Sequence, residues 1–115
     1  MTITKLNSIC NFSVLNMGNT DKTVNSVYCC DLLSIAMGQA PEGSAWITVM
    51  GNINSIAVAT LTGISCIILA SNMNLDDKAL SKAQQKDVCV LKSSLPVFET
   101  ALKVYEAITN EKPVL

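Results

Sequence analysis

The feature that most constrains this chain is an uncharged stretch, residues 45–70, which contains no Asp, Glu or Lys. The nearest charges are Glu42 before it and Asp76 after it. Two strand-like runs, at residues 46–50 and 64–70, flank a segment that is apolar nearly all round, which predicts strand, helix, strand. Such a helix must be covered on more than one side, and a continuous apolar strand is typical of a central parallel strand. We therefore expect these residues to form the buried centre of an α/β domain.

An uncharged stretch of this kind could also cross a membrane. A transmembrane helix needs about 20 consecutive, mainly apolar residues. The best apolar run, residues 56–70, is shorter and is interrupted by Thr60, Thr62, Gly63 and Ser65. The N-terminus also lacks the basic and apolar regions of a signal peptide. We therefore expect a cytoplasmic protein with no membrane contact.

Helix and strand signals continue on the N-terminal side of the stretch. The spacing of apolar residues predicts a helix over residues 4–10, a strand at 12–16 and a second strand from residue 24. Asp31 is expected to cap the next helix, with its carboxylate accepting backbone N–H bonds, and Gly38 to end that helix. Chain order is therefore helix, strand, strand, helix before the central stretch begins.

The C-terminal half alternates strand and helix. Asn52 is expected to cap a helix over residues 53–62, an amphipathic helix follows at 75–87, and a strand follows at 88–91. Ser94 is expected to cap the last helix, and residues 109–115 to fray. The residues expected on the buried face of that last helix recur at helical spacing: Phe98, Ala101, Leu102 and Tyr105.

This alternation predicts the fold class. Strand, helix, strand repeats imply crossover connections and a mainly parallel sheet with helices on both faces. A chain of 115 residues is long enough for one core. We therefore expect a single domain over residues 1–115, a three-layer α/β/α fold with a mainly parallel, mixed sheet.

The composition excludes several functions. The chain contains neither histidine nor arginine and carries a net charge of −1. It therefore lacks the commonest general base and metal ligand, the bidentate guanidinium clamp for phosphate, and the basic surface that binds nucleic acid. No glycine-rich phosphate loop is present. The five cysteines contain no Cys-x-x-Cys pair, and we expect them to be reduced thiols that pack as small hydrophobes. We expect no enzyme activity, no metal and no cofactor.

The remaining candidate site lies where the predicted parallel strands end. Ligands bind outside the carboxyl ends of strands in open α/β sheets, beside helix N-termini. The candidate ligand-binding residues follow three predicted strands: Cys30, Asp31, Gly51, Asn52, Asn54 and Ser71. They could hold an adenine edge or an anion. Helix capping alone is the alternative explanation for Asp31 and Asn52, and a redox role for Cys30 is a further one.

Several blocks of sequence resemble DRTGG-domain proteins. The blocks are VYCCDLLSIAMGQAPEGSAWITV, NINSIAVATLTGISCIILA, LDDKALSKAQQKDVCVLKS and LPVFE, and the resemblance spans about residues 6–108. It implies a fold similar to the N-terminal domain of HPr kinase/phosphorylase and to modules of phosphotransacetylases and of some inorganic pyrophosphatases. In those proteins the module is regulatory and dimerising. The chain departs from the family at Cys30, Gln39 and Asn52, where relatives commonly have glycine, arginine and histidine, and it lacks the tetrapeptide that names the family.

These observations lead to three functional hypotheses. The first is a non-catalytic regulatory and dimerisation module that acts through protein–protein contacts as a homodimer, with an enzyme as its partner. The second is an adenine-nucleotide-sensing module that regulates a partner enzyme. The third, which rests on the labels given to stand-alone relatives, is an accessory role in a serine kinase or hydrogenase system.

Overall fold

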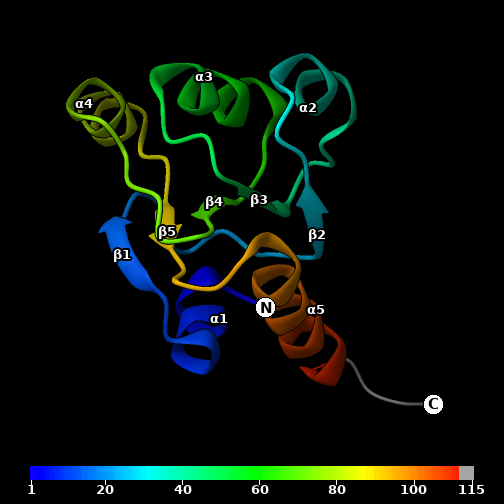
Figure 1. Ribbon diagram of the computed structural model, residues 1–115. Helices are drawn as coiled ribbons and strands as arrows, with labels where there is room; N and C mark the ends of the chain where they lie inside the picture. Colours follow the sequence, from blue (N-terminus) through cyan, green and yellow to red (C-terminus); the bar gives the residue numbers. More distant parts are fainter. Residues whose placement is uncertain (112–115) are drawn as a thin grey trace.

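The protein folds into a five-stranded sheet between two layers of helices (Figure 1). The computed structural model describes residues 1–111. The strands are β1 (Ser13–Asn16), β2 (Ser26–Cys29), β3 (Ser44–Thr48), β4 (Cys66–Leu69) and β5 (Val90–Lys92). The helices are α1 (Ile3–Cys10), α2 (Leu33–Gln39), α3 (Ile53–Thr62), α4 (Asp77–Lys86) and α5 (Val97–Glu111).

The sheet is mixed and mainly parallel, as the sequence predicts. Its strand order is β1-β5-β4-β3-β2, with β2 to β5 parallel to one another and β1 antiparallel to β5. The central strand is β4, and all four of its residues are buried. The uncharged stretch therefore does form the middle of the domain, with β3 beside β4 and α3 between them in the chain.

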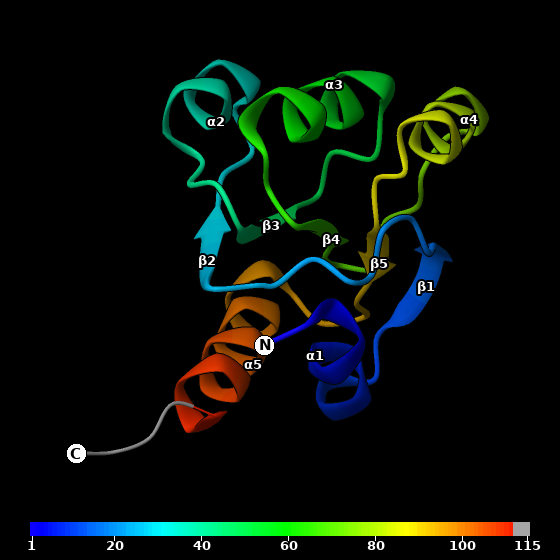
Figure 2. The same ribbon diagram turned by 180° about the vertical axis from the view of Figure 1, so that it is seen from behind.

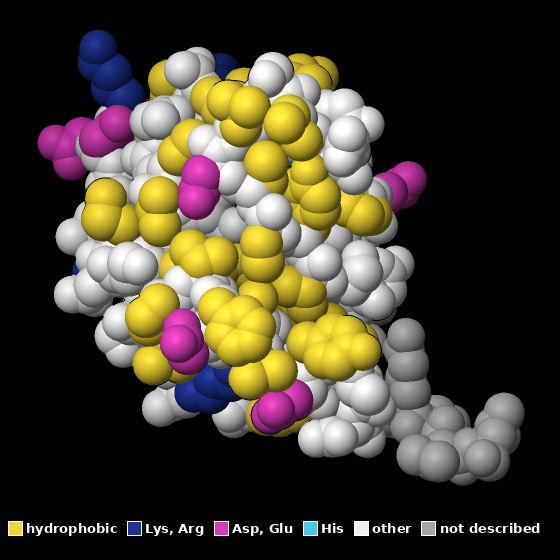
Figure 3. All heavy atoms as spheres, turned by 45° about the vertical axis from the view of Figure 1, so that its right-hand side comes forward, with side chains coloured by type: hydrophobic (Ala, Val, Ile, Leu, Met, Phe, Trp, Pro, Cys, Tyr) yellow, Lys and Arg dark blue, Asp and Glu magenta, His cyan; other side chains and the backbone are white. Residues whose placement is uncertain are grey.

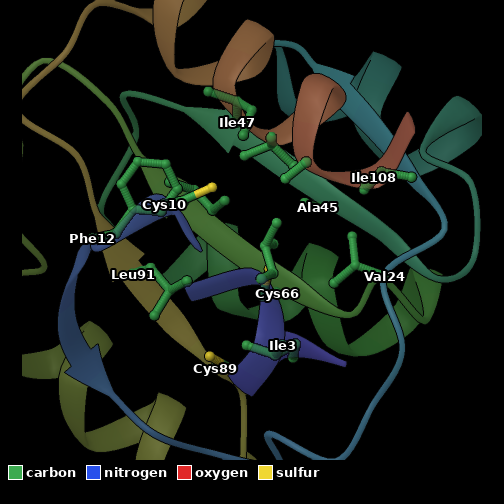
Figure 4. Packing of buried hydrophobic residues seen from close by; sticks show 14 of the residues in the cluster. Ile3, Cys10, Phe12, Val24, Ala45, Ile47, Cys66, Cys89, Leu91 and Ile108 are labelled. Atoms are coloured by element: carbon green, nitrogen blue, oxygen red, sulfur yellow. The ribbon is translucent and has the colours of Figure 1, made fainter. Parts of the chain in front are cut away.

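Helices cover both faces of the sheet, which confirms the three-layer α/β/α class (Figures 1 and 2). We name the face covered by α1 and α5 the two-helix face, and the face covered by α2, α3 and α4 the three-helix face. Each face has its own apolar cluster. On the two-helix face Ile3 of α1, Cys66 of β4 and Ile108 of α5 belong to one cluster, and Figure 4 shows their side chains. On the three-helix face the largest buried side chain is that of Trp46.

The helix in the middle of the three-helix face has the ends that the sequence predicts. Asn52 caps α3, since its side-chain oxygen accepts from the N–H groups of Asn54 at 2.9 Å and Ser55 at 3.2 Å. Gly63 ends α3 in the left-handed conformation, at φ 74°. In both views α3 lies between α2 and α4, so neighbours cover its two flanks. Its outward side is not covered, since Ile53 is 42% and Leu61 72% exposed.

Other helix ends differ from the prediction. Leu32, not Asp31, occupies the cap position of α2, and α2 extends one residue past Gly38 to Gln39. Ser94 does not cap α5, which begins only at Val97. Pro96 supplies the reason, because the residue before a proline disfavours helical backbone. Of the expected frayed tail, residues 109–111 continue α5, and residues 112–115 lie outside the described residues.

The predicted buried face of α5 is wrong for three of its four residues, whereas Ala101 is half-buried against the apolar cluster of the two-helix face. Phe98 is 69% exposed, Leu102 41% and Tyr105 60%. The residues of α5 that are buried instead are Thr100, Val104, Ala107 and Ile108. A buried polar contact fixes this rotation: the hydroxyls of Thr100 and Ser93 lie 2.8 Å apart, and the Thr100 hydroxyl also donates to the Leu95 carbonyl at 3.1 Å. Small and branched side chains therefore face the sheet, and the aromatic ones face outward.

Candidate functional site

The six predicted site residues all follow strands at the carboxyl edge of the sheet, which we name the rim. Cys30 and Asp31 follow β2. Gly51, Asn52 and Asn54 follow β3, and Ser71 follows β4. The loops that carry these residues are bonded to one another.

Asp31 and Cys30 join the end of β2 to β3. The Asp31 carboxylate accepts from the Thr48 hydroxyl at 2.8 Å and from the Val49 N–H at 3.0 Å. The Cys30 carbonyl accepts from the Trp46 indole N–H at 2.9 Å. Asp31 therefore satisfies polar groups at the end of β3 instead of capping α2.

Gly51 allows two rim loops to touch. A Cβ added at Gly51 would lie 2.2 Å from the backbone oxygen of Asn74, so only glycine fits without a shift. The Gly51 carbonyl also accepts from the Asp76 N–H at 3.1 Å. Asn54 lies in the first turn of α3 with an exposed side chain, next to the cap residue Asn52.

Ser71 sits in the loop that joins β4 to α4. Both Ser71 and Asn72 have left-handed backbone, at φ 55° and 60°. Their N–H groups donate to the carbonyls of Leu95 at 2.7 Å and Ser93 at 2.9 Å. These bonds tie the loop after β4 to the loop after β5.

A polar pocket of about 130 Å³ opens beside these loops, and we name it the rim pocket. Its lining residues come from α1, β1, the loops after β4 and β5, and α5: Cys10, Asn11, Phe12, Ser13, Asn72, Lys92, Ser93, Ser94, Leu95 and Lys103. None of the six predicted residues lines it. This volume is well below the ~300–1,000 Å³ of a typical small-molecule site, so the pocket has room for a small polar group and not for a whole nucleotide.

Two lysines give the rim pocket its electrostatic character. The Lys92 ammonium donates to the Asn74 side-chain oxygen at 2.7 Å, and the Lys103 ammonium lies 5.6 Å from the centroid of the Phe12 ring. Both partners are neutral, and no carboxylate lines the pocket. The arrangement suits a small anion, such as a phosphate or a carboxylate group, in a chain whose net charge is −1.

Sequence reasoning missed this pocket for an identifiable reason. Lys92, Ser93 and Ser94 follow a predicted strand and could have been noticed as a polar strand end. Asn11 and Lys103 are far from them in the chain, and no local pattern joins the three segments. Only the packing of α1 and α5 on the two-helix face brings them together.

The thiols are inert where they are buried. Burial raises the pKa of Cys89 from its ordinary value of 9.0 to about 11 and raises the pKa of Cys66 well above that value. Burial, with the nearby Asp31 carboxylate, also raises the pKa of Cys29. A raised pKa disfavours the reactive thiolate. Across residues 1–111, no group of three or more Cys, Asp and Glu side chains could hold a metal ion.

Comparisons with known proteins identify a similar fold. No family model matches this chain, and no curated protein matches its sequence. The fold is similar to a solved structure, that of the CBS and DRTGG domains of the regulatory region of Clostridium perfringens pyrophosphatase, complexed with the activator diadenosine tetraphosphate. The TM-score is 0.68 at 10% sequence identity, over 92% of this chain and 46% of that one.

The chain thus spans about half the length of the similar structure.

Within the described residues, no helix is both long and apolar enough to span a membrane. The fold of this chain is DRTGG-like.

Proposed function

We propose that this chain is a non-catalytic regulatory module that works as a homodimer and acts on a partner enzyme through protein–protein contacts. The observation that carries the proposal is the row of large apolar side chains that α5 turns outward, Phe98, Leu102 and Tyr105. Large contiguous apolar patches on a protein surface mark interaction sites, and this row would form part of such a patch. The fold similarity to the regulatory region of a pyrophosphatase supports a regulatory role.

The chemistry of the rim supports a role without catalysis. Asp31 is occupied by two hydrogen bonds to the end of β3, and Asn52 caps α3. A general acid or base needs a proton-accepting side chain that is free to meet a substrate. These rim groups instead hold the loops in place.

The regulatory role is tested with a candidate partner enzyme. The purified chain is added to enzymes encoded beside its gene, and each reaction rate is measured with and without it. We expect a saturable change in rate for the partner and no turnover by the chain alone. The candidate partner enzymes include a serine kinase and a hydrogenase system. Turnover of ATP by the chain alone would contradict the proposal.

The rim pocket favours a second candidate function, adenine-nucleotide sensing. The similar structure was solved with diadenosine tetraphosphate bound to its regulatory region. In this chain Lys92 and Lys103 offer two positive charges to the phosphates of a nucleotide. The predicted rim residues, among them Asn52, Asn54 and Ser71, are the proposed neighbours of its adenine. Cys30, Asp31 and Gly51 complete that proposed set.

Thermal unfolding separates this candidate from the first. Ligand binding to the folded state adds about 2.7 kcal/mol of stability at a concentration of 100 times Kd. We expect the melting temperature to rise with the concentration of AMP, ADP or ATP. The Lys92→Gln/Lys103→Gln variant should lose that rise, whereas Lys78→Gln/Lys86→Gln, which removes the same charge from α4, should keep it. An unchanged melting temperature at millimolar nucleotide would rule nucleotide sensing out.

A further inference from the structure

We infer that the second copy of this chain binds across one continuous face, in a two-fold arrangement that places the α5 helices antiparallel to each other. We name this the outer face. It consists of exposed α2 residues, the free edge of β2 and exposed α5 residues: Leu32, Ile35, Met37, residues 26–29, Phe98, Leu102 and Tyr105. The inference rests on the proposed homodimer and adds the surface and the symmetry.

The α5 part of the outer face has the geometry of a helix contact. Phe98, Leu102 and Tyr105 stand at positions i, i+4 and i+7, so they form one stripe along the helix. The opposite side of α5 already fills the core with Val104 and Ile108. The stripe is therefore surplus to the fold of one copy.

The β2 edge connects this stripe to α2. Among the described residues β2 pairs only with β3, so its other edge is open to a further strand. In Figure 3, which brings the α2, β2 and α5 side of the molecule forward, apolar side chains run in a band from one end of this face to the other. The exposed α2 residues are Leu32 at 55%, Ile35 at 43% and Met37 at 42%. An open edge flanked by apolar helices on both sides is a pairing surface.

The two exposed rings of α5 supply only part of the area that a dimer interface requires. At about 200 Å² for each ring, Phe98 and Tyr105 together expose roughly 260 Å². A standard interface buries about 800 Å² on each partner. The two rings supply about a third of that area, so the interface must extend over β2 and α2, where the remaining apolar side chains lie.

The stripe is also complementary to itself. Phe98 and Tyr105 lie at equal distances along the helix from a point between Ala101 and Leu102. Ala101 itself is half-buried and packs against the core. An antiparallel α5 pair with a two-fold axis at that point places Phe98 near the partner's Tyr105, and the reverse contact follows from symmetry. Aromatic pairs of this kind add ~0.5–1.5 kcal/mol each beyond the area they bury.

Charges beside the stripe are compatible with a second copy. Glu99, Lys103 and Glu106 are exposed residues of α5 and carry both signs. Bringing two such helices together therefore does not concentrate charges of one sign. A chemically different partner would need a stripe that matches these positions, whereas a second copy already has it.

Sedimentation equilibrium on the full chain tests the inference. We expect a dimer at micromolar concentration, and a dissociation constant that rises at least about 100-fold in Phe98→Ser/Tyr105→Ser, because each truncated aromatic anchor weakens binding by about 10-fold or more. The control is Leu61→Ser, which removes a side chain that is 72% exposed on α3 and should leave the constant unchanged. Circular dichroism confirms that each variant is folded.

Cross-linking tests the symmetry. In a Cys29→Ser background, Leu102→Cys should form an intermolecular disulfide under mild oxidation, because the two-fold axis passes beside it. Leu61→Cys in the same background should not. A monomeric wild-type chain would overturn both this inference and the proposed homodimer. A dimer that survives Phe98→Ser/Tyr105→Ser, or that cross-links through Leu61→Cys only, would overturn the outer face alone.

Discussion

The two faces of the sheet are covered differently, and the difference shows in how their helices are oriented. On the three-helix face α3 lies between α2 and α4, and its apolar surface is covered on both flanks. On the two-helix face α1 and α5 share the same sheet, and α5 lies at the β2 edge with one side uncovered. Both helices leave one side exposed, but they differ in what they place there: α3 exposes the aliphatic Ile53 and Leu61, whereas α5 exposes two aromatic side chains.

In α5 the largest side chains are not the ones that are buried. In α5 the side chains that face the core are those of Thr100, Val104 and Ala107, which are smaller than the exposed Phe98 and Tyr105. The hydrophobic effect favours burying the largest apolar area available. A surface that contradicts this preference in the monomer is satisfied when another molecule covers it, and this is the physical basis of the outer face.

The largest effect is expected in the loops of the three-helix face. Gly51→Ala should destabilise the fold by about 3 kcal/mol, because its Cβ would meet the Asn74 backbone oxygen at 2.2 Å and the loops would have to separate. Gly38→Ala is the matched control, since no heavy atom lies within 4 Å of its Cβ, and it should stabilise α2 by ~0.5–1 kcal/mol. Urea unfolding measures both. Equal stability of the two variants would show that the rim loops are not in contact.

The orientation of α5 is tested by two adjacent residues. Val104→Ala should cost about 2–3 kcal/mol, because the side chain is fully buried in the two-helix cluster. Tyr105→Ala should change the stability of the monomer by less than ~0.5 kcal/mol. Urea unfolding is carried out at a concentration below the dimer dissociation constant. The reverse order of the two losses would mean that the sequence-based face of α5 is the correct one.

The buried thiols of the two-helix face predict a loss of stability in alkali. The pKa of Cys89 is about 11 in the folded protein and near 9 when unfolded, so above pH 9 the unfolded state releases a proton that the folded state keeps. Its stabilising contribution is complete below pH 9 and is lost as the pH rises to about 11. The loss attributable to Cys89 is about 3 kcal/mol, from two units of pKa at ~1.36 kcal/mol each.

Comparison with a variant isolates this effect. Chemical unfolding is measured at intervals between pH 8 and 11 for the wild type and for Cys89→Ala. The variant should lose less stability over that window, although Cys66 still contributes. Parallel pH profiles for the two proteins would show that Cys89 is accessible to solvent.

The smallest effect concerns the cap at the start of α3. Asn52→Ala should cost about 1 kcal/mol, because it removes the acceptor for the N–H groups of Asn54 and Ser55. Asn54→Ala changes an exposed side chain two residues away and should stay within ~0.5 kcal/mol of the wild type. Thermal unfolding compares the two. A greater loss at Asn54 would point to a contact of its side chain beyond the cap.

Much of the fold could be predicted from local patterns. The uncharged stretch predicted β4 as the central strand, and Asn52 and Gly63 marked both ends of α3. The candidate site was predicted less well. The order of the strand ends was predicted, although β3 ends at Thr48 and not at residue 50. The hydrogen bonds of Asp31 to Thr48 and Val49 join segments that are 17 and 18 residues apart. No spacing rule relates such residues, so the prediction assigned Asp31 to the nearest helix.

By itself the sequence determined the order of helices and strands, the mainly parallel sheet and the two ends of α3, because these depend on periodicity and on caps within a few residues. Tertiary structure alone decided which side of α5 is buried and which groups form the rim pocket. The pairing of Thr100 with Ser93 sets the rotation of α5, and the packing of α1 and α5 brings Asn11 beside Lys92 and Lys103. Local sequence patterns do not specify how a helix is rotated against the sheet, because that rotation depends on contacts between distant segments. Here those contacts place the aromatic side chains of α5 on the outside.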